Sequence, residues 1–201
     1  MSSVLSSSIF RVISGNFDLN SGINRGSKLG ATVGITPKLN IPLDEKGIVE
    51  EPLYWEPFMA FVPDYHPMKN DEFLLASEIN VNDLLLLNEG HCFRNSVLKL
   101  CQANSQEGQG LQMESGNFDT LVKLAHRGMG MTLLPYLTAI DLDEKYKPSV
   151  KPIATPTPGR EISLLYARTQ LKVEWIEAMG ELIKAHLPQK VLSKPEQIVS
   201  P

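Results

Sequence analysis

The chain contains two cysteines, and both lie in the stretch GHCFRNSVLKLCQ, as Cys92 and Cys101. Thiols carry redox or nucleophilic chemistry where the thiolate is stabilised, and elsewhere they act as small apolar core residues. A structural zinc site needs four ligands, which neither the nine-residue spacing nor the neighbouring residues supply. From the spacing alone, two inert core cysteines are the favoured interpretation, and a redox pair is the alternative.

The segment between the cysteines has the apolar period of a helix. Phe93, Val97, Leu98 and Cys101 occupy positions i, i+4, i+5 and i+8. Nine helical residues advance about 13.5 Å along the axis and place the two end side chains on opposite faces. A disulfide needs Cα atoms roughly 4.4–6.8 Å apart. The two thiols therefore cannot bond while this helix exists, which is the outline of a two-state switch.

The two cysteines differ in their expected reactivity. Cys92 would begin the helix, where free N–H groups stabilise a thiolate, and Arg94 would add positive charge. His91 could orient a substrate oxygen, whereas Cys101 lies beside apolar Leu98, a poor place for a thiolate. An oxidant would convert Cys92 to a sulfenic acid, with which Cys101 would condense. The simpler alternatives are a solvated Arg94 and a polar loop residue at His91.

The elements that must position this segment alternate between strands and helices. Helices are expected at 93–101, 117–127 and 172–187, with strands at 31–37, 58–63, 83–90, 131–135 and 161–168. The glycines at 128 and 130 should end the second helix, and 152–160 reads as a Pro-rich turn. In the last helix the apolar face comprises Val173, Ile176, Met179, Leu182, Ile183 and Leu187. The alternation predicts an α/β class with a largely parallel or mixed sheet, and a frayed tail after 187.

Composition excludes several classes of protein. The 201 residues carry a net charge of -4 and a pI near 5.6, which argues against a DNA-contacting domain. No apolar run approaches the ~18–20 residues of a membrane span, and the start lacks the features of a secretory signal. Two cysteines are too few for a disulfide-stapled secreted fold, so a cytoplasmic location with reduced thiols is expected. No cofactor or metal motif is present, so no cofactor is expected.

The order LLLLNEGHCFRNSVLKLCQ resembles the redox switch of the OxyR family, the peroxide-sensing LysR-type transcriptional regulators. That family carries a GHC-x-R motif with a second cysteine nine residues after the first. The matching residues are Gly90, His91, Cys92, Arg94 and Cys101. The stretches EEPLYWEPFMAFVPDYHPM, GMGMTLLP and PGREISLLYAR are also similar to the family, so the resemblance covers about residues 31–190. Within it, Arg160 matches an arginine that the family places near the peroxidatic cysteine.

The resemblance implies a periplasmic-binding-protein-like effector domain, in which two α/β subdomains are joined by two crossover strands. Regulatory subdomain I would comprise residues 1–57 plus 163–201. Subdomain II would comprise 58–162 and contain the switch segment 90–102. Cys92 would face the cleft between the subdomains. Residues 1–30 do not match the family's first strand, helix and threonine-bearing loop, so no peroxide-holding threonine is assigned.

The resemblance also implies a function and partners. Hydrogen peroxide would oxidise Cys92, the peroxidatic residue, with help from His91, Arg94 and Arg160, and Cys101 would resolve the product as a disulfide. A homodimer or homotetramer and a thioredoxin- or glutaredoxin-type reductant are the implied partners. DNA would be bound only through an N-terminal helix-turn-helix domain, which is not found in this sequence, and no membrane is involved.

Two alternatives come from other classes of function. A metabolite-binding effector domain on the same fold would have inert cysteines and take a small molecule, such as a carboxylate. A peroxide-reducing enzyme would share the chemistry at Cys92 but would need a reductant for turnover, and no thioredoxin-like C-x-x-C is present. A Cys92 thiol that reacts slowly would favour the metabolite-binding domain. Peroxide consumption well beyond one equivalent per chain would favour the enzyme. The sensor, which is not an enzyme, remains the leading hypothesis.

Overall fold

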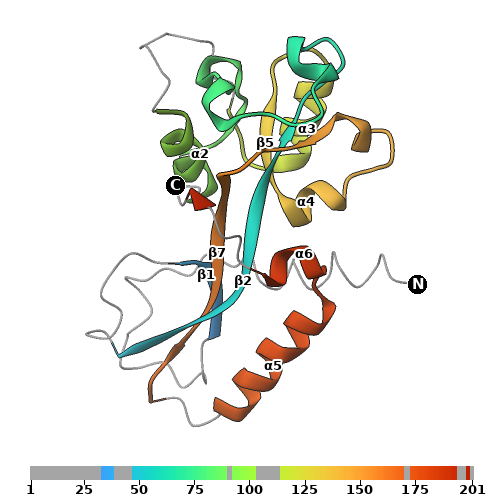
Figure 1. The fold of residues 1–201 in the computed structure, drawn as a ribbon. Coiled ribbons are helices and arrows are strands. Elements are labelled where there is room, and N and C mark those ends of the chain that lie inside the picture. Colours follow the sequence, from blue (N-terminus) through green and yellow to red (C-terminus); the bar gives the residue numbers. More distant parts are fainter. Residues whose placement is uncertain are drawn as a thin grey trace. The chain divides into compact units, whose positions relative to one another are not determined.

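The computed structural model describes the following residues of the chain (Figure 1): 33–38, 47–89, 92–102, 114–169, 173–193 and 198–199. Expectations about residues 1–30 and His91 lie outside this part of the chain. For Cys92 and Cys101 the backbone is described and the side chains are not. None of the described helices is both long and apolar enough to cross a membrane.

Contacts divide the chain into two units. Unit 1 comprises residues 1–54 and 161–188, and unit 2 comprises 55–160 and 189–201. The chain passes from one unit to the other within two long strands, β2 (Ile48–Phe61) and β7 (Thr157–Ala167). Residues 189–201 group with unit 2, whereas the sequence assigned them to subdomain I. The expected subdomain limits, after residues 57 and 162, stay a prediction.

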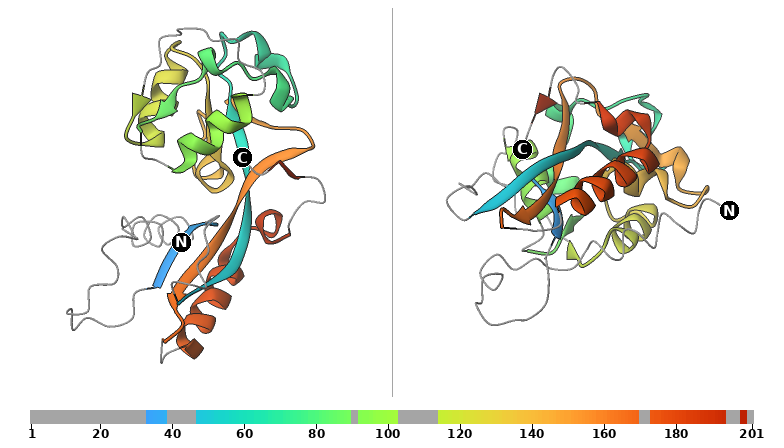
Figure 2. Two further views of the ribbon diagram at one scale, coloured as in Figure 1. Left: turned by 90° about the vertical axis from the view of Figure 1, so that its left-hand side faces the viewer. Right: turned by 90° about the horizontal axis from the view of Figure 1, so that it is seen from below.

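Unit 1 packs one helix beside a sheet. β1 (Val33–Pro37) pairs antiparallel with β7, and α5 (Val173–His186) runs alongside the unit 1 portions of β2 and β7 (Figure 2). Its buried cluster contains Leu53, Leu164 and Ile176. The predicted helix is confirmed, but Leu182 is wrongly placed on its buried face, since it is 61% exposed. The stripe that packs is narrower than the pattern suggested and centres on Ile176 and Gly180.

The strands of unit 2 form a mixed arrangement, as expected. β5 (Thr132–Pro135) and β6 (Val150–Pro152) both pair antiparallel with the end of β2. β3 (Leu86–Leu87) pairs parallel with β4 (Glu114–Ser115), and β8 (Ile198–Val199) pairs parallel with the start of β7. The order in the main sheet is β1-β7-β2-β5.

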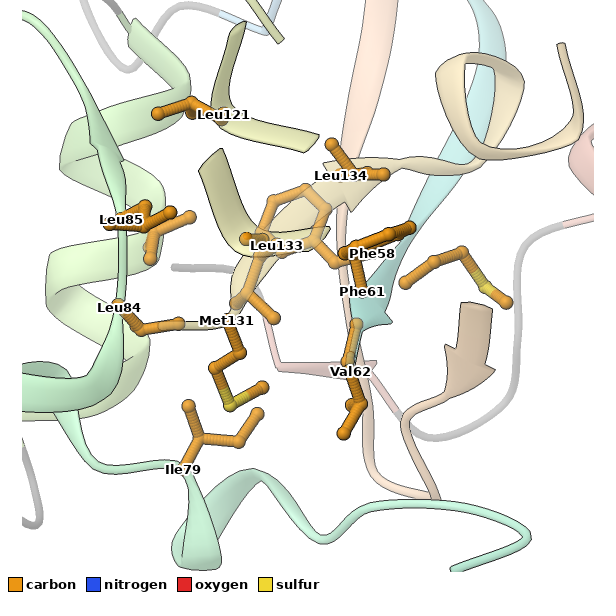
Figure 3. Close-up of a cluster of buried hydrophobic side chains, with 14 of the residues drawn as sticks. Phe58, Phe61, Val62, Ile79, Leu84, Leu85, Leu121, Met131, Leu133 and Leu134 are labelled. Carbon is orange, nitrogen blue, oxygen red and sulfur yellow. The ribbon is translucent and has the colours of Figure 1, made fainter. Parts of the chain in front are cut away.

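The apolar core of unit 2 holds these strands against α3 (Phe118–His126). Figure 3 shows Phe58, Leu133 and Met131 among its central side chains. The four leucines at 84–87 are all buried, as predicted, although only the last two belong to a strand. Gly128 and Gly130 follow α3 with φ values of 101° and 136°, which confirms the glycine-rich end of this helix.

Three expected boundaries are wrong. β2 begins at Ile48, ten residues before the expected strand, and its extended backbone accommodates Pro52 and Pro57. β7 begins at Thr157, inside the expected turn, where it pairs with β8. The tail was expected to fray, but in its described part α6 (Gln189–Leu192) is helical and Val191 is fully buried. Unit 2 also contains the short helix α4 (Tyr136–Ile140).

Candidate functional site

Cys92 and Cys101 lie at opposite ends of one helix, α2 (Cys92–Gln102). This confirms the helix predicted from the apolar period. At about 1.5 Å of rise per residue, the helix keeps their Cα atoms about 13.5 Å apart along its axis. That separation is roughly twice the range of a disulfide. A bond between the two thiols therefore requires this helix to be opened.

The inner face of α2 is anchored in the core of unit 2. Phe93 and Val97 are each 2% exposed, and Leu100 is also buried. The Phe93 ring makes edge contacts with Phe58 and Phe118, at centroid distances of 4.8 and 5.2 Å. Such pairs add about 0.5–1.5 kcal/mol each beyond the burial of area. The first turn of the helix, which begins at Cys92, is therefore held by aromatic packing.

Arg94 belongs to the same buried face. It is 8% exposed, and its Nη1 donates a hydrogen bond to the Leu87 carbonyl at 3.1 Å. This bond ties the first turn of α2 to β3. The alternative of a solvated helix residue is therefore wrong, because the guanidinium is used inside the unit. A direct role of Arg94 toward Cys92 stays a prediction.

Arg160, at the unit 2 end of β7, approaches α2 from another element. Its guanidinium carbon lies 5.2 Å from the centroid of the Phe93 ring, in cation–π geometry. Phe93 directly follows Cys92 in the chain, so the cation is close to the first turn of the helix. The structure thus brings Arg160 and the start of α2 together. His91 lies outside the described residues and is not placed.

The partner of Arg160 is Glu56 in β2, a residue that the sequence analysis missed. Arg160 Nε and Nη2 both donate to Glu56 Oε2, at 3.0 and 2.8 Å, and the Leu137 N–H donates to Oε1 at 3.4 Å. The Glu56 side chain is only 2% exposed. A signal was present, because Glu56 is the single charge within the apolar run LYWEPFMAFV. Buried carboxylates need such partners.

Gly159 allows the two strands that carry this pair to meet. A Cβ added at this position would lie 2.8 Å from the Glu56 carbonyl oxygen and 2.9 Å from the Trp55 ring. Real Cβ atoms do not approach so closely, so any side chain here would push β7 away from β2. The Glu56–Arg160 pair therefore depends on the glycine beside it.

The space beneath α2 is too small for a metabolite. A cavity of about 10 Å³, lined by residues including Phe93, Arg94 and Thr132, could hold no more than one water molecule. A shallow surface hollow of about 480 Å³ is lined by other residues, among them Tyr65, Asp83 and Met129. Within the described part of the chain, no group of three or more His, Cys, Asp or Glu gathers to hold a metal ion.

The family described as LysR substrate binding domain matches residues 31–188. A relative from Mycobacterium leprae, named probable hydrogen peroxide-inducible genes activator, is 30% identical over 147 residues, which are 71% of this chain and 47% of the relative. The Escherichia coli K12 protein named DNA-binding transcriptional dual regulator OxyR is 29% identical over 150 residues, 72% of this chain and 47% of that protein. The chain thus spans about half the length of these curated relatives.

Solved structures with the same fold include OxyR proteins. The crystal structure of OxyR from Porphyromonas gingivalis has a TM-score of 0.70 at 24% identity, covering 84% of this chain and 75% of that one. The reduced OxyR regulatory domain from Pseudomonas aeruginosa has a TM-score of 0.63 at 27% identity, covering 76% and 72%. These similarities confirm the expected α/β, periplasmic-binding-protein-like fold.

Proposed function

The chain belongs to the LysR substrate-binding domain family, and from this membership we propose that it is the peroxide-sensing part of a LysR-type transcriptional regulator. The observation that carries the proposal is the placement of Cys92 and Cys101 at the two ends of α2. The names of the relatives, which are hydrogen peroxide-inducible activators, support it.

The proposed chemistry begins at Cys92. Its thiolate attacks one oxygen of hydrogen peroxide, the O–O bond breaks, and the leaving hydroxide takes a proton to become water. The product is a sulfenic acid on Cys92. The Cys101 thiolate then attacks the Cys92 sulfur, the S–O bond breaks, and a second water leaves. Two thiols and one peroxide thus give one disulfide and two waters.

Arg160 is the described residue best placed to assist the first step. Its guanidinium, held over the Phe93 ring, brings positive charge to the helix turn that starts at Cys92. A nearby cation lowers a thiol pKa and stabilises a leaving hydroxide. His91 would orient the peroxide. Arg94 would contribute mainly by fixing this turn to β3, through its bond to Leu87.

Disulfide formation would release the inner face of α2. If Phe93, Val97 and Leu100 all left the core, the cost would be on the order of 5–9 kcal/mol, at about 1.5–3 kcal/mol for each side chain. The same burial would drive the helix to re-form once the bond is reduced. The two states would then be distinct packings of one element, selected by thiol oxidation.

Other parts of the proposal concern the whole protein. A DNA-binding domain beyond the present sequence would read the change in this one. The regulator would act as a homodimer or homotetramer. A thioredoxin- or glutaredoxin-type reductant would return the disulfide to two thiols. These partners follow from the family resemblance, and the chain spans about half of its curated relatives.

The test treats the 201-residue chain with one equivalent of peroxide. Peptide mass spectrometry should find a Cys92–Cys101 disulfide, and far-UV circular dichroism should show loss of helix. The Cys92→Ser variant should show neither change. A helix signal that still responds to peroxide in this variant would contradict the proposal. Continuous peroxide consumption would instead indicate a peroxidase, and an unreactive Cys92 would indicate a metabolite-binding domain.

A further inference from the structure

The Glu56 carboxylate is buried, charged and absent from the chemistry described so far. It is one of the few charged side chains inside unit 2, at 2% exposure. Placing a carboxylate in an apolar interior is unfavourable unless it gains partners there. Its partners lead from β2 to β7 through Arg160 and to the start of α4 through the Leu137 N–H.

The contacts of Arg160 show what Glu56 does to it. Both Nε and Nη2 point to a single oxygen, Oε2, which fixes the plane and direction of the guanidinium. The guanidinium also contacts the ring of Phe93. Among the described residues, none accepts a hydrogen bond from Nη1. The side chain is 17% exposed and could swing into solvent without its tether.

We propose that Glu56 is a positioning residue for the reaction of Cys92: it holds the Arg160 guanidinium against Phe93, at the first turn of α2. This inference rests on the proposed function and deepens it. Glu56 acts through Arg160 and touches neither peroxide nor thiol. The other described charge in this turn is Arg94, which is engaged with Leu87, and His91 lies outside the described residues.

The sign of the effect separates positioning from simple neutralisation. If Glu56 only cancelled the charge of Arg160, its loss would strengthen the positive field, lower the Cys92 pKa and speed the thiol. If Glu56 positions Arg160, its loss would let the cation leave, which raises the Cys92 pKa and slows the thiol. Neutral variants of Glu56, one with an acceptor oxygen and one without, distinguish positioning from charge cancellation.

The experiment measures alkylation of Cys92 by iodoacetamide against pH, in the full chain carrying Cys101→Ser. Glu56→Met, which removes both acceptors at similar volume, should raise the apparent Cys92 pKa by about one unit, a tenfold loss of reactivity below the pKa. Glu56→Gln keeps an oxygen for Arg160 and should stay within about threefold of the parent. Glu161→Gln, which breaks the neighbouring Lys38–Glu161 ion pair, is the matched control and should change nothing.

Two further variants also test the inference. Arg160→Lys keeps the charge but lacks the planar fork, so it should also raise the Cys92 pKa, even if Glu56→Met fails to fold. In an Arg160→Met background, Glu56→Met should cause no additional shift, because the two residues act as one unit. An unchanged or lowered pKa in Glu56→Met or Arg160→Lys would overturn the inference. Alkylation needs no peroxide, so absence of the disulfide in the parent would reject the proposed function alone.

Discussion

The guanidinium of Arg160 lies over the ring of Phe93, with 5.2 Å between the guanidinium carbon and the ring centroid. The cation comes from β7 and the ring from α2, in parts of the chain more than sixty residues apart. Phe93 thereby contacts a cation on one side and the aromatic rings of Phe58 and Phe118 on others. The first turn of α2 is thus fixed by one side chain with several partners.

Phe93→Ala should destabilise the chain by about 3–5 kcal/mol, because it removes a buried aromatic side chain and leaves a cavity. The free energy of unfolding from urea titration measures this. Trp175→Ala, at an exposed aromatic residue of α5, is the control and should change stability by less than about 0.5 kcal/mol. Equal losses in the two variants would show that the Phe93 contacts do not stabilise α2.

Arg94→Met should cost about 1–3 kcal/mol, because the Leu87 carbonyl loses its charged donor while the aliphatic part of the side chain is kept. Lys99→Met, on the exposed face of the same helix, should be close to neutral. Urea titration of both variants gives the comparison. A neutral Arg94→Met would mean that water replaces the guanidinium without loss.

Gly159→Ala should destabilise the chain by about 1–3 kcal/mol, since the new Cβ would overlap the Glu56 carbonyl and the Trp55 ring. Thermal unfolding with a two-state fit would measure this loss. Gly116→Ala is the matched control, because its Cβ would meet only the Asn88 amide, at 3.9 Å. A lower melting temperature in Gly116→Ala alone would contradict the close approach of β2 and β7.

Tyr166 should make stability fall at alkaline pH. Burial raises its pKa above 10.0, and the nearby carboxylates of Glu51 and Glu177 raise it further. Because the folded pKa is the higher one, its contribution is complete below the unfolded pKa and is lost as pH rises through the folded value. Tyrosinate absorbance at 295 nm should show a late-titrating component that is absent in Tyr166→Phe. An unshifted titration in the native chain would contradict this.

Local patterns in the sequence predicted α2, α3 and α5, since each has an apolar period of three to four residues. The four buried leucines and the glycine-rich end of α3 were also predicted from the sequence. Patterns could not give the full length of β2, because Pro52 and Pro57 look like breaks and only neighbouring strands show that they are tolerated. The burial of Val191 in the described part of the tail was also missed, because the local pattern around it does not show a buried position.

The candidate site was predictable only in part. The cysteine spacing and the family resemblance proposed Cys92, Cys101, His91, Arg94 and Arg160 as site residues, and their roles stay predictions. The burial of Arg94 and the role of Glu56 could not be read there, because each depends on a partner far away in the chain. The single charge in an apolar strand indicates that Glu56 is unusual, but the sequence does not show that its partner is Arg160.

The close approach at Gly159 has an entropic consequence. Ion pairs between long side chains are ordinarily weak, because two flexible chains must be ordered to form them. Here the two backbones meet beside the pair, so Glu56 and Arg160 begin from strands that already hold them at the right separation. Most of the ordering is therefore done when the sheet folds, and little conformational freedom is left for the side chains to lose. The guanidinium is pre-organised by the smallest residue in the chain.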